Sequence, residues 1–434
     1  MTPAARIAAA IDLIGTIDAQ PRRPADATVN DFFRTRRYIG SGDRRAVAER
    51  AWSVIRQRMR LDWHLGEIGA AQTARHLILA QLILVDGWKL EGLSNAFPGG
   101  GHAAEPLTPA ETQVARALAK RSLIDQAMPE PIRYNVPAWA LPGFQARFGE
   151  RLTEVSAAMD QPAPLDLRAN LLRTSREVAQ KALAGEGIET ELTPLSPWGL
   201  RIPSRRPISA TVAYEKGLVE IQDEGSQLIA LLTDAQPGMR VADYCAGAAG
   251  KTLAIAATMG NRGRIVACDV SEKRLQGAVV RLRRAGVDNA ERHLLVPGDR
   301  FVKRRAEQFD RVLVDAPCTG TGTWRRNPDG RTRTGPQDLT ELLEKQAVIL
   351  DTASRLVRSG GKLVYATCSV LPEENEGQVD AFLARHTEFE RVPLAESWAG
   401  QGLAVPPPCE GPDMALDPAR HGTDGFFAAV LRRR

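Results

Sequence analysis

The chain has 434 residues, more than one ordinary domain holds, and a usual domain length of about 150 residues predicts two or three domains. Apolar residues make up 43% and charged residues 25% of the sequence, which excludes a largely disordered chain. The formal net charge of +5 favours a polyanionic partner.

The cysteines and histidines give no sign of a metal site. The five cysteines form no C-x-x-C pair and the six histidines no H-x-x-x-H pattern. An odd, sparse set of thiols is typical of a reduced, cytoplasmic protein. The N-terminus lacks a signal-peptide pattern, and the longest apolar run, residues 76–85, is too short to cross a bilayer. We therefore expect a cytoplasmic monomer with no metal and no membrane partner.

The first part of the chain carries a helical pattern from residue 4 to about residue 129, with a strongly apolar helix around residues 77–84. The run Thr108-Pro109-Ala110-Glu111 predicts a helix start, because it combines a threonine cap, proline at the first helical position and glutamate at the third. Residues 1–130 are therefore predicted to form an all-helical domain.

Residues 131–207 are predicted to form a small α/β domain. The expected elements are a strand at 165–172, a helix at 175–185, and short strands at 189–193 and 199–202. The arginines at its edge are Arg201, Arg205 and Arg206. Its sheet face is suited to hold RNA, but a connecting domain with solvated arginines fits the sequence equally well.

From about residue 208 strands and helices alternate regularly, which predicts a doubly wound, mostly parallel sheet. Strands are expected at 240–244, 264–269, 293–296, 311–315, 362–367 and 426–431, and helices at 251–259, 271–285 and 338–358. In an open sheet of this kind, ligands bind outside the carboxyl ends of the strands.

A turn of small residues follows the first of these strands. It reads Cys245-Ala246-Gly247-Ala248-Ala249-Gly250-Lys251 and opens a helix. Small side chains let backbone amides approach a ligand closely. Asp269 ends the second strand, where a carboxylate can accept both hydroxyls of a ribose. Asp299 follows the third strand and is either an adenine contact or a turn residue. These features fit a nicotinamide dinucleotide and S-adenosylmethionine alike.

The fourth and fifth strands end in cysteine motifs. Asp315-Ala316-Pro317-Cys318 follows the fourth strand, where an amino-group methyltransferase is expected to carry an Asn/Asp-Pro-Pro-aromatic segment. Cys318 in place of the aromatic residue indicates covalent chemistry at carbon. Thr367-Cys368-Ser369 ends the fifth strand. Most cysteines are buried core residues, but two at neighbouring strand ends favour a catalytic interpretation.

Methylation of cytosine at carbon 5 needs such residues. A thiolate that adds to carbon 6 turns the ring into an enamine, which can attack a sulfonium methyl group. A base must then remove the carbon 5 proton so that the thiol can leave. A thiol of ordinary pKa, about 8.5, must be activated by its surroundings. Asp315 is suitably placed to protonate or hydrogen-bond the ring nitrogen.

The segments 317–331, PCTGTGTWRRNPDGR, and 363–375, LVYATCSVLPEEN, resemble the signature motifs of the Sun/Fmu (RsmB-like) family of RNA cytosine-5 methyltransferases. VEIQDEGSQL at 219–228 is also similar to that family. The resemblance covers residues 208–434, and upstream the layout resembles a NusB-like helical domain and a small RNA-binding domain. It implies an α/β fold, with a class I Rossmann-like domain on a mostly parallel seven-stranded sheet at 208–434.

The resemblance also implies residue roles. Cys368 corresponds to the family's nucleophile, and Cys318 to the cysteine that assists product release. DNA cytosine methyltransferases attack with the Pro-Cys cysteine instead and carry a Glu-Asn-Val segment, which this sequence lacks. The S-adenosylmethionine contacts carried over are Cys245, Ala246, Gly247, Ala248, Ala249, Gly250, Lys251, Asp269, Asp299 and Asp315.

The sequence departs from the family pattern at two places. The family loop usually reads Cys-Ala-Ala-Pro-Gly-Gly-Lys, and Ala249 stands at a glycine position. An alanine there is expected to strain a backbone of positive φ by about 1 kcal/mol and so to weaken cofactor binding. Further on, Arg331-Thr332-Arg333 replaces an aromatic-containing stretch.

We therefore expect methyl transfer to a cytosine in RNA, with small-subunit (16S) ribosomal RNA favoured over transfer RNA by family analogy. The flipped cytosine's phosphates are expected to meet Arg325, Arg326 and residues 303–305, although these cations are also compatible with a solvated surface. Two alternatives stay open. One is an RNA-binding protein with a decayed methyltransferase core, and the other is a nicotinamide oxidoreductase, for which no hydride-transfer residues are found.

Overall fold

The computed structural model describes residues 1–203, 207–401, 403 and 405–434. The chain forms two compact units, which are described separately. The first contains residues 1–161 together with residues 327–335, and the second contains residues 162–326 and 336–434. The first unit is therefore discontinuous in sequence.

The first unit is helical, which agrees with the helical N-terminal region predicted for residues 1–130, and it also includes residues 131–161, which were assigned to the small α/β domain. Its helices are α1 (Pro3–Asp18), α2 (Ala25–Thr35), α3 (Ser41–Arg56), α4 (Arg58–Glu67), α5 (Ala74–Leu84), α6 (Leu90–Ala96), α7 (Pro109–Leu118), α8 (Glu130–Arg133), α9 (Leu141–Phe148), α10 (Leu152–Met159) and α17 (Gly330–Arg333), with a 3-10 turn at Gly149–Arg151. Leu77 and Leu82 of α5 are fully buried in a core with Leu13 of α1. The capping box of α7 is confirmed, because the Thr108 hydroxyl accepts from Glu111 N and the Glu111 carboxylate accepts from Thr108 N.

Residues 327–335 are held in this unit by two carboxylates. Asp329 Oδ2 accepts from Ala25 N at 3.1 Å and so caps α2, whose own preceding residue, Pro24, has no side chain that can do so. Arg331 is 4% exposed, and its guanidinium donates to Asp160 Oδ1 at 3.0 Å and to Met159 O at 3.1 Å. Burial lowers the pKa of Arg331 to about 10. Arg331 is thus part of the packing of the helical unit.

Asp160 is the anion on which this buried cluster depends. Arg60 Nη1 reaches its Oδ2 at 2.5 Å, and Asn135 Nδ2 donates to its Oδ1 at 2.7 Å. Arg60, Asn135 and Asp160 are all buried. One carboxylate therefore serves two buried guanidinium groups, Arg60 and Arg331.

The second unit is built on a large mixed sheet of the strand order β10-β12-β9-β8-β5-β6-β7, with β11 paired to β12. Its strands are β5 (Arg240–Asp243), β6 (Arg264–Asp269), β7 (Ala290–Leu294), β8 (Phe309–Asp315), β9 (Val357–Thr367), β10 (Phe389–Val392), β11 (Met414–Leu416) and β12 (Phe426–Arg433). The five strands from β9 to β7 are parallel, whereas β12 runs antiparallel to β9. This is the α/β class predicted from the sequence.

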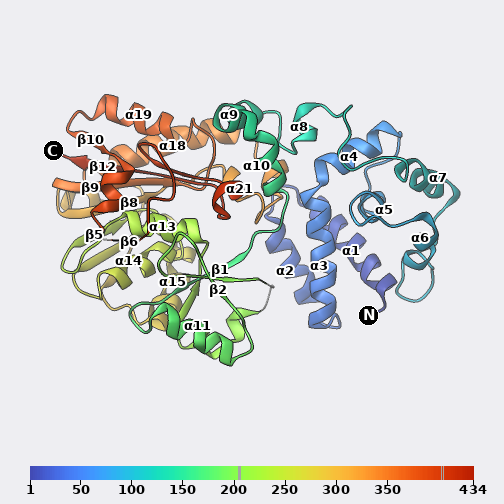
Figure 1. The fold of residues 1–434 in the computed structure, drawn as a ribbon, viewed down its shortest axis with the longest axis horizontal. Coiled ribbons are helices and arrows are strands. Elements are labelled where there is room, and N and C mark those ends of the chain that lie inside the picture. The colour runs from blue at the N-terminus through green and yellow to red at the C-terminus, as the bar shows by residue number, and fades with distance from the viewer. Residues whose placement is uncertain (204–206, 402, 404) are drawn as a thin grey trace. The chain divides into compact units, whose positions relative to one another are not determined.

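Helices cover both faces of the large sheet. They are α13 (Glu224–Leu232), α14 (Gly250–Thr258), α15 (Glu272–Ala285), α16 (Phe301–Arg304), α18 (Pro336–Ser354), α19 (Glu376–Arg385), α20 (Leu394–Ala399) and α21 (Pro418–His421), with a 3-10 turn at Thr321–Thr323. Figure 1 shows α18 and α19 on one face and α13, α14 and α15 on the other. A strand covered on both faces must be apolar where the helices cover it, as the buried stretches of β5, β6, β8 and β9 are, whereas polar residues lie mostly at or toward the strand ends.

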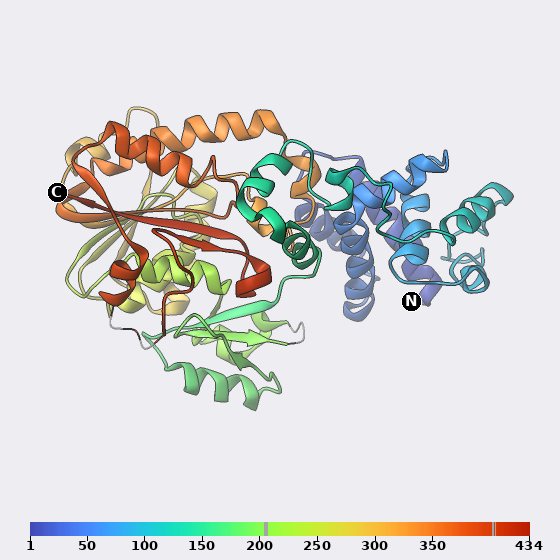
Figure 2. The ribbon, with the colours of Figure 1, turned by 45° about the horizontal axis from the view of Figure 1, so that its top comes forward.

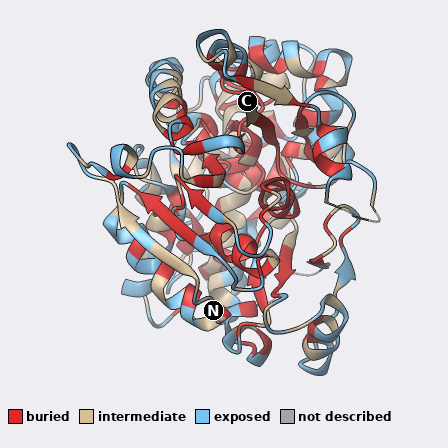
Figure 3. Cartoon of the chain, turned by 90° about the vertical axis from the view of Figure 1, so that its left-hand side faces the viewer, coloured by how far each residue is buried: buried red, intermediate tan, exposed pale blue. Residues whose placement is uncertain are grey.

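Successive strand residues serve opposite faces of the sheet. In β8, Leu313 packs with the side that holds α13 and α14, whereas Val312 and Val314 pack against α18 and α19. In β9, Val364 and Tyr365 divide in the same way. Figure 3 shows the result, with buried residues concentrated on the central strands and exposed residues on the outer surfaces of the helices.

A smaller sheet belongs to the same unit and has the order β2-β3-β1-β4. Its elements are β1 (Leu165–Ala169), α11 (Arg176–Gly185), β2 (Glu191–Leu192), β3 (Gly199–Ile202), α12 (Val212–Glu215) and β4 (Val219–Ile221), with a 3-10 turn at Ile208–Ala210. Figure 2 shows this sheet with α11, in green, packed on one face. The strand β4 is not among the predicted elements, and it carries the small sheet past residue 207.

Several elements have bounds in the structure that differ from those predicted. The strand β1 stops at Ala169, because the Asn170 amide turns to bind the carbonyls of Gly217 and Ala285. The strand β7 ends at Leu294, before the turn in which Asp299 N donates to Val296 O. The helix α18 ends at Ser354 rather than at 358, and β9 begins already at Val357, which is fully buried against the sheet.

Across the described ranges, no helix combines the length and the apolar character needed to cross a membrane. Within the same ranges, no group of three or more histidine, cysteine, aspartate and glutamate side chains is arranged to hold a metal ion.

The shared carboxylate of Asp160 predicts a large effect of its removal. Asp160→Asn leaves Arg60 and Arg331 buried without a counter-charge, so the helical unit should lose about 3–5 kcal/mol of its free energy of unfolding. Hydrogen exchange of peptides from residues 1–161 measures this loss. Glu291→Gln breaks the exposed Arg264–Glu291 pair and is the control, with an expected change below about 1 kcal/mol. Equal, small effects of both substitutions would contradict the role given to Asp160.

Candidate functional site

The site residues predicted from the sequence lie at or beyond the carboxyl ends of β5, β6, β7, β8 and β9, which are neighbours in the sheet. The loop between β5 and α14 is fixed by backbone contacts on both sides. Ala246 N donates to Cys268 O at 2.8 Å, and Ala248 O accepts from Arg281 at 2.8 Å. Gly250 begins α14. A Cβ added at Gly247 meets nothing within 4 Å, so this part of the loop faces open space.

Ala249 adopts the left-handed conformation, with φ of 63°. This was predicted because glycine usually stands at this position of the loop. Such a backbone costs an alanine about 1–2 kcal/mol. The Ala249 side chain is also fully buried, in a cluster with Leu253, Ala278 and Leu282. Burial of a methyl group returns about 0.8 kcal/mol, so packing offsets much of the strain.

Asp269 ties the loop to the end of β6. Its carboxylate accepts from Gly247 N at 2.8 Å and from Ser271 N at 2.7 Å, and the residue is 4% exposed. Directly beyond it, Val270 is 77% exposed, and Val296, beyond the neighbouring strand β7, is 51% exposed. Exposed apolar side chains at two adjacent strand ends fit the flat ring of a nucleoside.

Asp299 lies beyond β7, and its contacts are with His293 and Phe301. Its Oδ2 is 2.5 Å from His293 Nε2, and its Oδ1 accepts from Phe301 N at 2.8 Å. The His293 hydrogen bond is the main reason that the pKa of Asp299 is lowered. The imidazole stacks on the Phe301 ring, with centroids 4.3 Å apart. Asp299 is therefore an anion held in a fixed turn.

An ion pair joins the loop 245–251 to the end of β8. Lys251 Nζ is 2.5 Å from Asp315 Oδ2, and Lys251 is 9% exposed. Burial lowers the pKa of Lys251, but the Asp315 carboxylate outweighs it and the net change is upward. Beneath them, Asp243 accepts from the Thr252 hydroxyl, and burial raises the pKa of Asp243 to about 6. The lysine therefore stays charged beside Asp315.

Cys318 and Cys368 face one another. Their Sγ atoms are 3.3 Å apart, and both side chains are half-buried. The hydrogen bond to Cys368, followed by burial, raises the pKa of Cys318 well above its usual range. The raised pKa favours a protonated Cys318, which can donate to the Cys368 sulfur, although the distance alone allows either thiol to be the donor. A charge on Cys368 also contributes to the raised pKa of Lys251, after the larger effects of Asp315 and Asp243.

Hydroxyl groups and glycines hold the two cysteine loops together. The Thr321 and Ser369 hydroxyls are 3.0 Å apart, and Gly322 N donates to Cys368 O at 3.0 Å. Gly322 also lies against Gly425, whose N–H donates to Gly322 O at 2.8 Å. A side chain at Gly322 would come within 2.1 Å of Gly425 O, so this contact requires glycine.

The remaining cysteines of the sheet have another environment. Burial raises the pKa of Cys245 and of Cys268, and neighbouring carboxylates such as Asp243 add to the effect. Both thiols are therefore protonated, and they pack with the sheet core.

The expectation that Arg325 meets phosphates is wrong. Arg325 is 5% exposed, and its guanidinium binds Asp424 Oδ1 at 2.6 Å and Gly422 O at 2.8 Å. Arg326 pairs with Asp424 at 2.8 Å and with Asp223 at 2.9 Å, although a third of its side chain is exposed. These arginines anchor the loop that carries Cys318.

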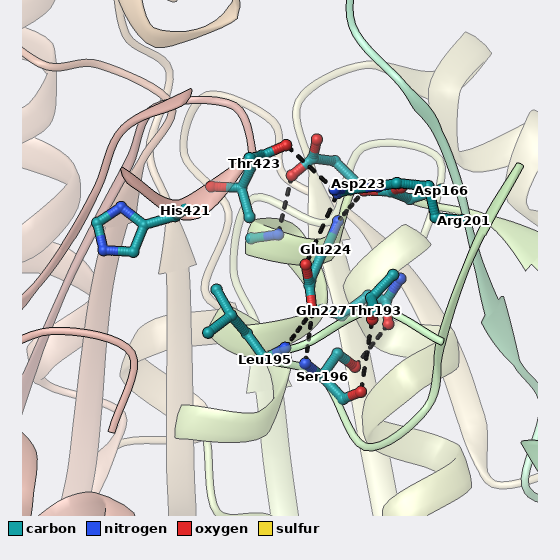
Figure 4. Close-up of polar contacts among 12 residues, drawn as sticks. Asp166, Thr193, Leu195, Ser196, Arg201, Asp223, Glu224, Gln227, His421 and Thr423 are labelled. Carbon is teal, nitrogen blue, oxygen red and sulfur yellow. Dashed lines mark hydrogen bonds and ion pairs between the residues drawn. The ribbon is translucent and has the colours of Figure 1, made fainter. Parts of the chain in front are cut away.

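Figure 4 shows polar contacts that join the small sheet to the start of α13. Arg201 of β3 binds the Asp166 carboxylate through two nitrogens, at 2.7 and 2.9 Å. Arg205 and Arg206, also expected to meet RNA, lie outside the described residues. At the start of α13, Glu224 Oε1 accepts from Leu195 N and Ser196 N at 2.6 and 2.7 Å.

Asp223 stands between these groups and Asp424. Burial, followed by the neighbouring Asp424 charge, raises the pKa of Asp223 to about 7. Sequence analysis missed Asp223, Glu224 and Asp424. The sequence gives only a weak indication of their role. Asp223 and Glu224 are charged residues at the start of an apolar helix, and Asp424 lies between two small residues.

Comparison with known proteins identifies the family to which the chain belongs. Residues 230–432 match the family model described as 16S rRNA methyltransferase RsmB/F, and residues 136–209 match that of the RsmF/B-like ferredoxin-like domain. A ribosomal RNA small subunit methyltransferase B from Klebsiella pneumoniae subsp. pneumoniae is 31% identical over 413 residues, 91% of this chain and 92% of the relative. The chain belongs to the RsmB/F methyltransferase family.

Further similarities agree with this assignment. A protein of Synechocystis sp., named as a probable ribosomal RNA small subunit methyltransferase B, is 36% identical over 307 residues, 69% of this chain and 67% of the relative. The crystal structure of PH0851 shares the fold with a TM-score of 0.77 at 24% identity and covers 100% of this chain and 99% of its own. The predicted Sun/Fmu resemblance is confirmed, and the chain is an S-adenosylmethionine-dependent RNA methyltransferase.

The glycine contact behind the Cys318 loop predicts a strict size limit. Gly322→Ala forces the loop away from Gly425, so we expect a loss of about 1–3 kcal/mol in stability and a marked loss of methyl transfer. Urea unfolding and a methylation assay measure the two effects. Gly277→Ala in α15 is the control, since its Cβ meets nothing, and it should stabilise the protein by about 0.5–1 kcal/mol. Full activity of Gly322→Ala would show that the contact does not matter.

Proposed function

We propose that this enzyme methylates carbon 5 of a cytosine in RNA through a covalent adduct with Cys368. The observation that carries the proposal is the pair of thiols 3.3 Å apart, next to the Lys251–Asp315 ion pair. One thiol can attack and the other can take part in release, which methylation of a ring nitrogen or an exocyclic amine does not require.

Attack begins with the Cys368 thiolate. Cys318 donates a hydrogen bond to its sulfur, and the Lys251 ammonium favours the negative charge. The thiolate electron pair forms a bond to carbon 6 of the cytosine. Asp315 would give a proton to the ring nitrogen, where negative charge develops, and Lys251 would stabilise the carboxylate that remains. The ring is then an enamine, nucleophilic at carbon 5.

The residues at the strand ends fit S-adenosylmethionine. Asp269 stands where a ribose would bind, the exposed Val270 and Val296 would flank the adenine, and Asp299 and the loop 245–251 complete the contacts. When bound, this cofactor supplies an electrophilic methyl group, which carbon 5 receives. Ala249 already fills its left-handed position, so the altered loop is compatible with binding.

Release requires Cys318 to accept a proton. Once Cys368 is a thioether, the hydrogen bond that held the proton on Cys318 is lost, so Cys318 can give that proton to solvent. The Cys318 thiolate then takes the proton from carbon 5, the electron pair of that bond restores the ring double bond, and Cys368 leaves as a thiolate. The ring nitrogen returns its proton to Asp315, and the net products are 5-methylcytosine, S-adenosylhomocysteine and one proton released to solvent.

We further propose 16S ribosomal RNA as the substrate, because the family model and the Klebsiella relative carry small-subunit ribosomal RNA in their names. Residues 131–207 would bind RNA beside the catalytic domain at 208–434, with residues 1–130 as a helical domain. The exposed Lys303 and Arg304 of α16 are suited to meet phosphates. The enzyme would act as a cytoplasmic monomer.

The division of labour between the thiols predicts opposite results for two substitutions. Cys368→Ala should reduce methyl transfer to background, because no adduct can form. Cys318→Ala should instead accumulate a protein–RNA adduct that survives denaturing gels, because the carbon 5 proton is not removed. An adduct with Cys368→Ala and none with Cys318→Ala would reverse the two roles.

The substrate is tested in cells. Bisulfite sequencing of total RNA, with and without the gene, should show one or a few cytosines of 16S ribosomal RNA that lose protection when the gene is deleted. Complementation by the unaltered gene, but not by Cys368→Ala, should restore protection. Loss of protection in transfer RNA alone would contradict the ribosomal substrate.

A further inference from the structure

One buried carboxylate beside the thiol pair has no part in the steps above. Glu374 follows Cys368 in the loop before α19 and is fully buried. Its neighbour Glu373 is exposed. Burial of a carboxylate is costly unless hydrogen bonds and charges compensate for it, so the contacts of Glu374 indicate its use.

The carboxylate binds the residue next to Cys318. Its Oε1 accepts from Thr319 N at 2.9 Å, and its Oε2 accepts from the Thr319 hydroxyl at 2.5 Å. Gln346 of α18 donates to Oε1 at 2.8 Å and to Pro317 O at 3.0 Å. Both residues that flank Cys318 are therefore fixed through Glu374 and Gln346.

The backbone around Glu374 is held by residues of β9 and of the segment that follows it. Its carbonyl accepts from the Tyr365 hydroxyl at 2.6 Å, and the adjacent Asn375 binds the Thr367 hydroxyl and Ser369 O at 2.6 and 3.0 Å. The Cys318 turn is thus held to the strand that ends in Cys368 by a single buried network.

We propose that Glu374 is a positioning residue for product release, because it fixes the Cys318 turn against the strand that ends in Cys368. This inference rests on the proposed function. The hydrogen bond to Cys368 and burial are the main causes that raise the pKa of the Cys318 thiol, and the charges of Cys368 and Glu374 add to them. Attack on the cytosine removes the charge of Cys368, so Glu374 remains as the charge that makes Cys318 a strong base for the carbon 5 proton.

The matched pair E374Q and E373Q tests the proposal. E374Q keeps the size of the side chain, but it removes the charge and replaces an acceptor by a donor that faces Thr319. We expect it to slow release, so that a protein–RNA adduct accumulates and turnover falls by about tenfold or more. E373Q changes an exposed residue and should behave like the unaltered enzyme.

A second readout separates positioning from general destabilisation. With Cys368→Ser present in both proteins, alkylation of Cys318 by iodoacetamide is followed against pH by mass spectrometry. Loss of the Glu374 charge should lower the pKa of Cys318, so the alkylation profile of E374Q should move to lower pH. If E374Q only lowers stability, with no adduct and an unchanged profile, the proposal is wrong. If Cys318→Ala itself gives no adduct, the proposed function fails instead.

Discussion

The parallel pairing of β8 with β9 is the constraint on which the proposed catalytic centre depends. The register sets Asp315 opposite Ala366, so the loops that leave the two strands start at the same edge of the sheet. Because each loop carries its cysteine within a few residues of the strand, the sulfur atoms meet without a long connection. A shift of the register by one residue would turn every side chain of β9 to the opposite face and separate the thiols.

Charge compensation then determines which groups are reactive. The carboxylates at the sheet edge are buried or half-buried, and each has a cation or a set of donors: Asp315 has Lys251, Asp424 has Arg325 and Arg326, and Glu374 has Thr319 and Gln346. A thiol in such surroundings is stabilised as a neutral group unless a cation faces it. The Lys251 ammonium interacts electrostatically with Cys368, whereas the Glu374 carboxylate acts on Cys318 and raises its pKa, so two chemically identical side chains have different electrostatic surroundings.

Much of this centre follows from sequence because its motifs are local. Strand periodicity placed Asp269, Asp315 and Cys368 at strand ends, and the glycine position in the loop predicted the positive φ of Ala249. Contacts between distant segments were not predictable in this way. Arg325 looks like a solvent-exposed cation until Asp424, 99 residues later, is seen to bind it. Glu373 and Glu374 are identical in type, and only the folded loop distinguishes the exposed residue from the buried one.

The discontinuity of the helical unit has a consequence for how the protein is made. Synthesis proceeds from the N-terminus, and domains that are continuous in sequence can fold as soon as they leave the ribosome. Here the cap of α2 and one partner of Asp160 come from Asp329 and Arg331, which emerge only after the first strands of the catalytic sheet. Until the chain has passed residue 335, α2 lacks its cap from Asp329 and Asp160 lacks its contact with Arg331. Final consolidation of the N-terminal unit is thereby linked in time to the synthesis of the loop that carries Cys318.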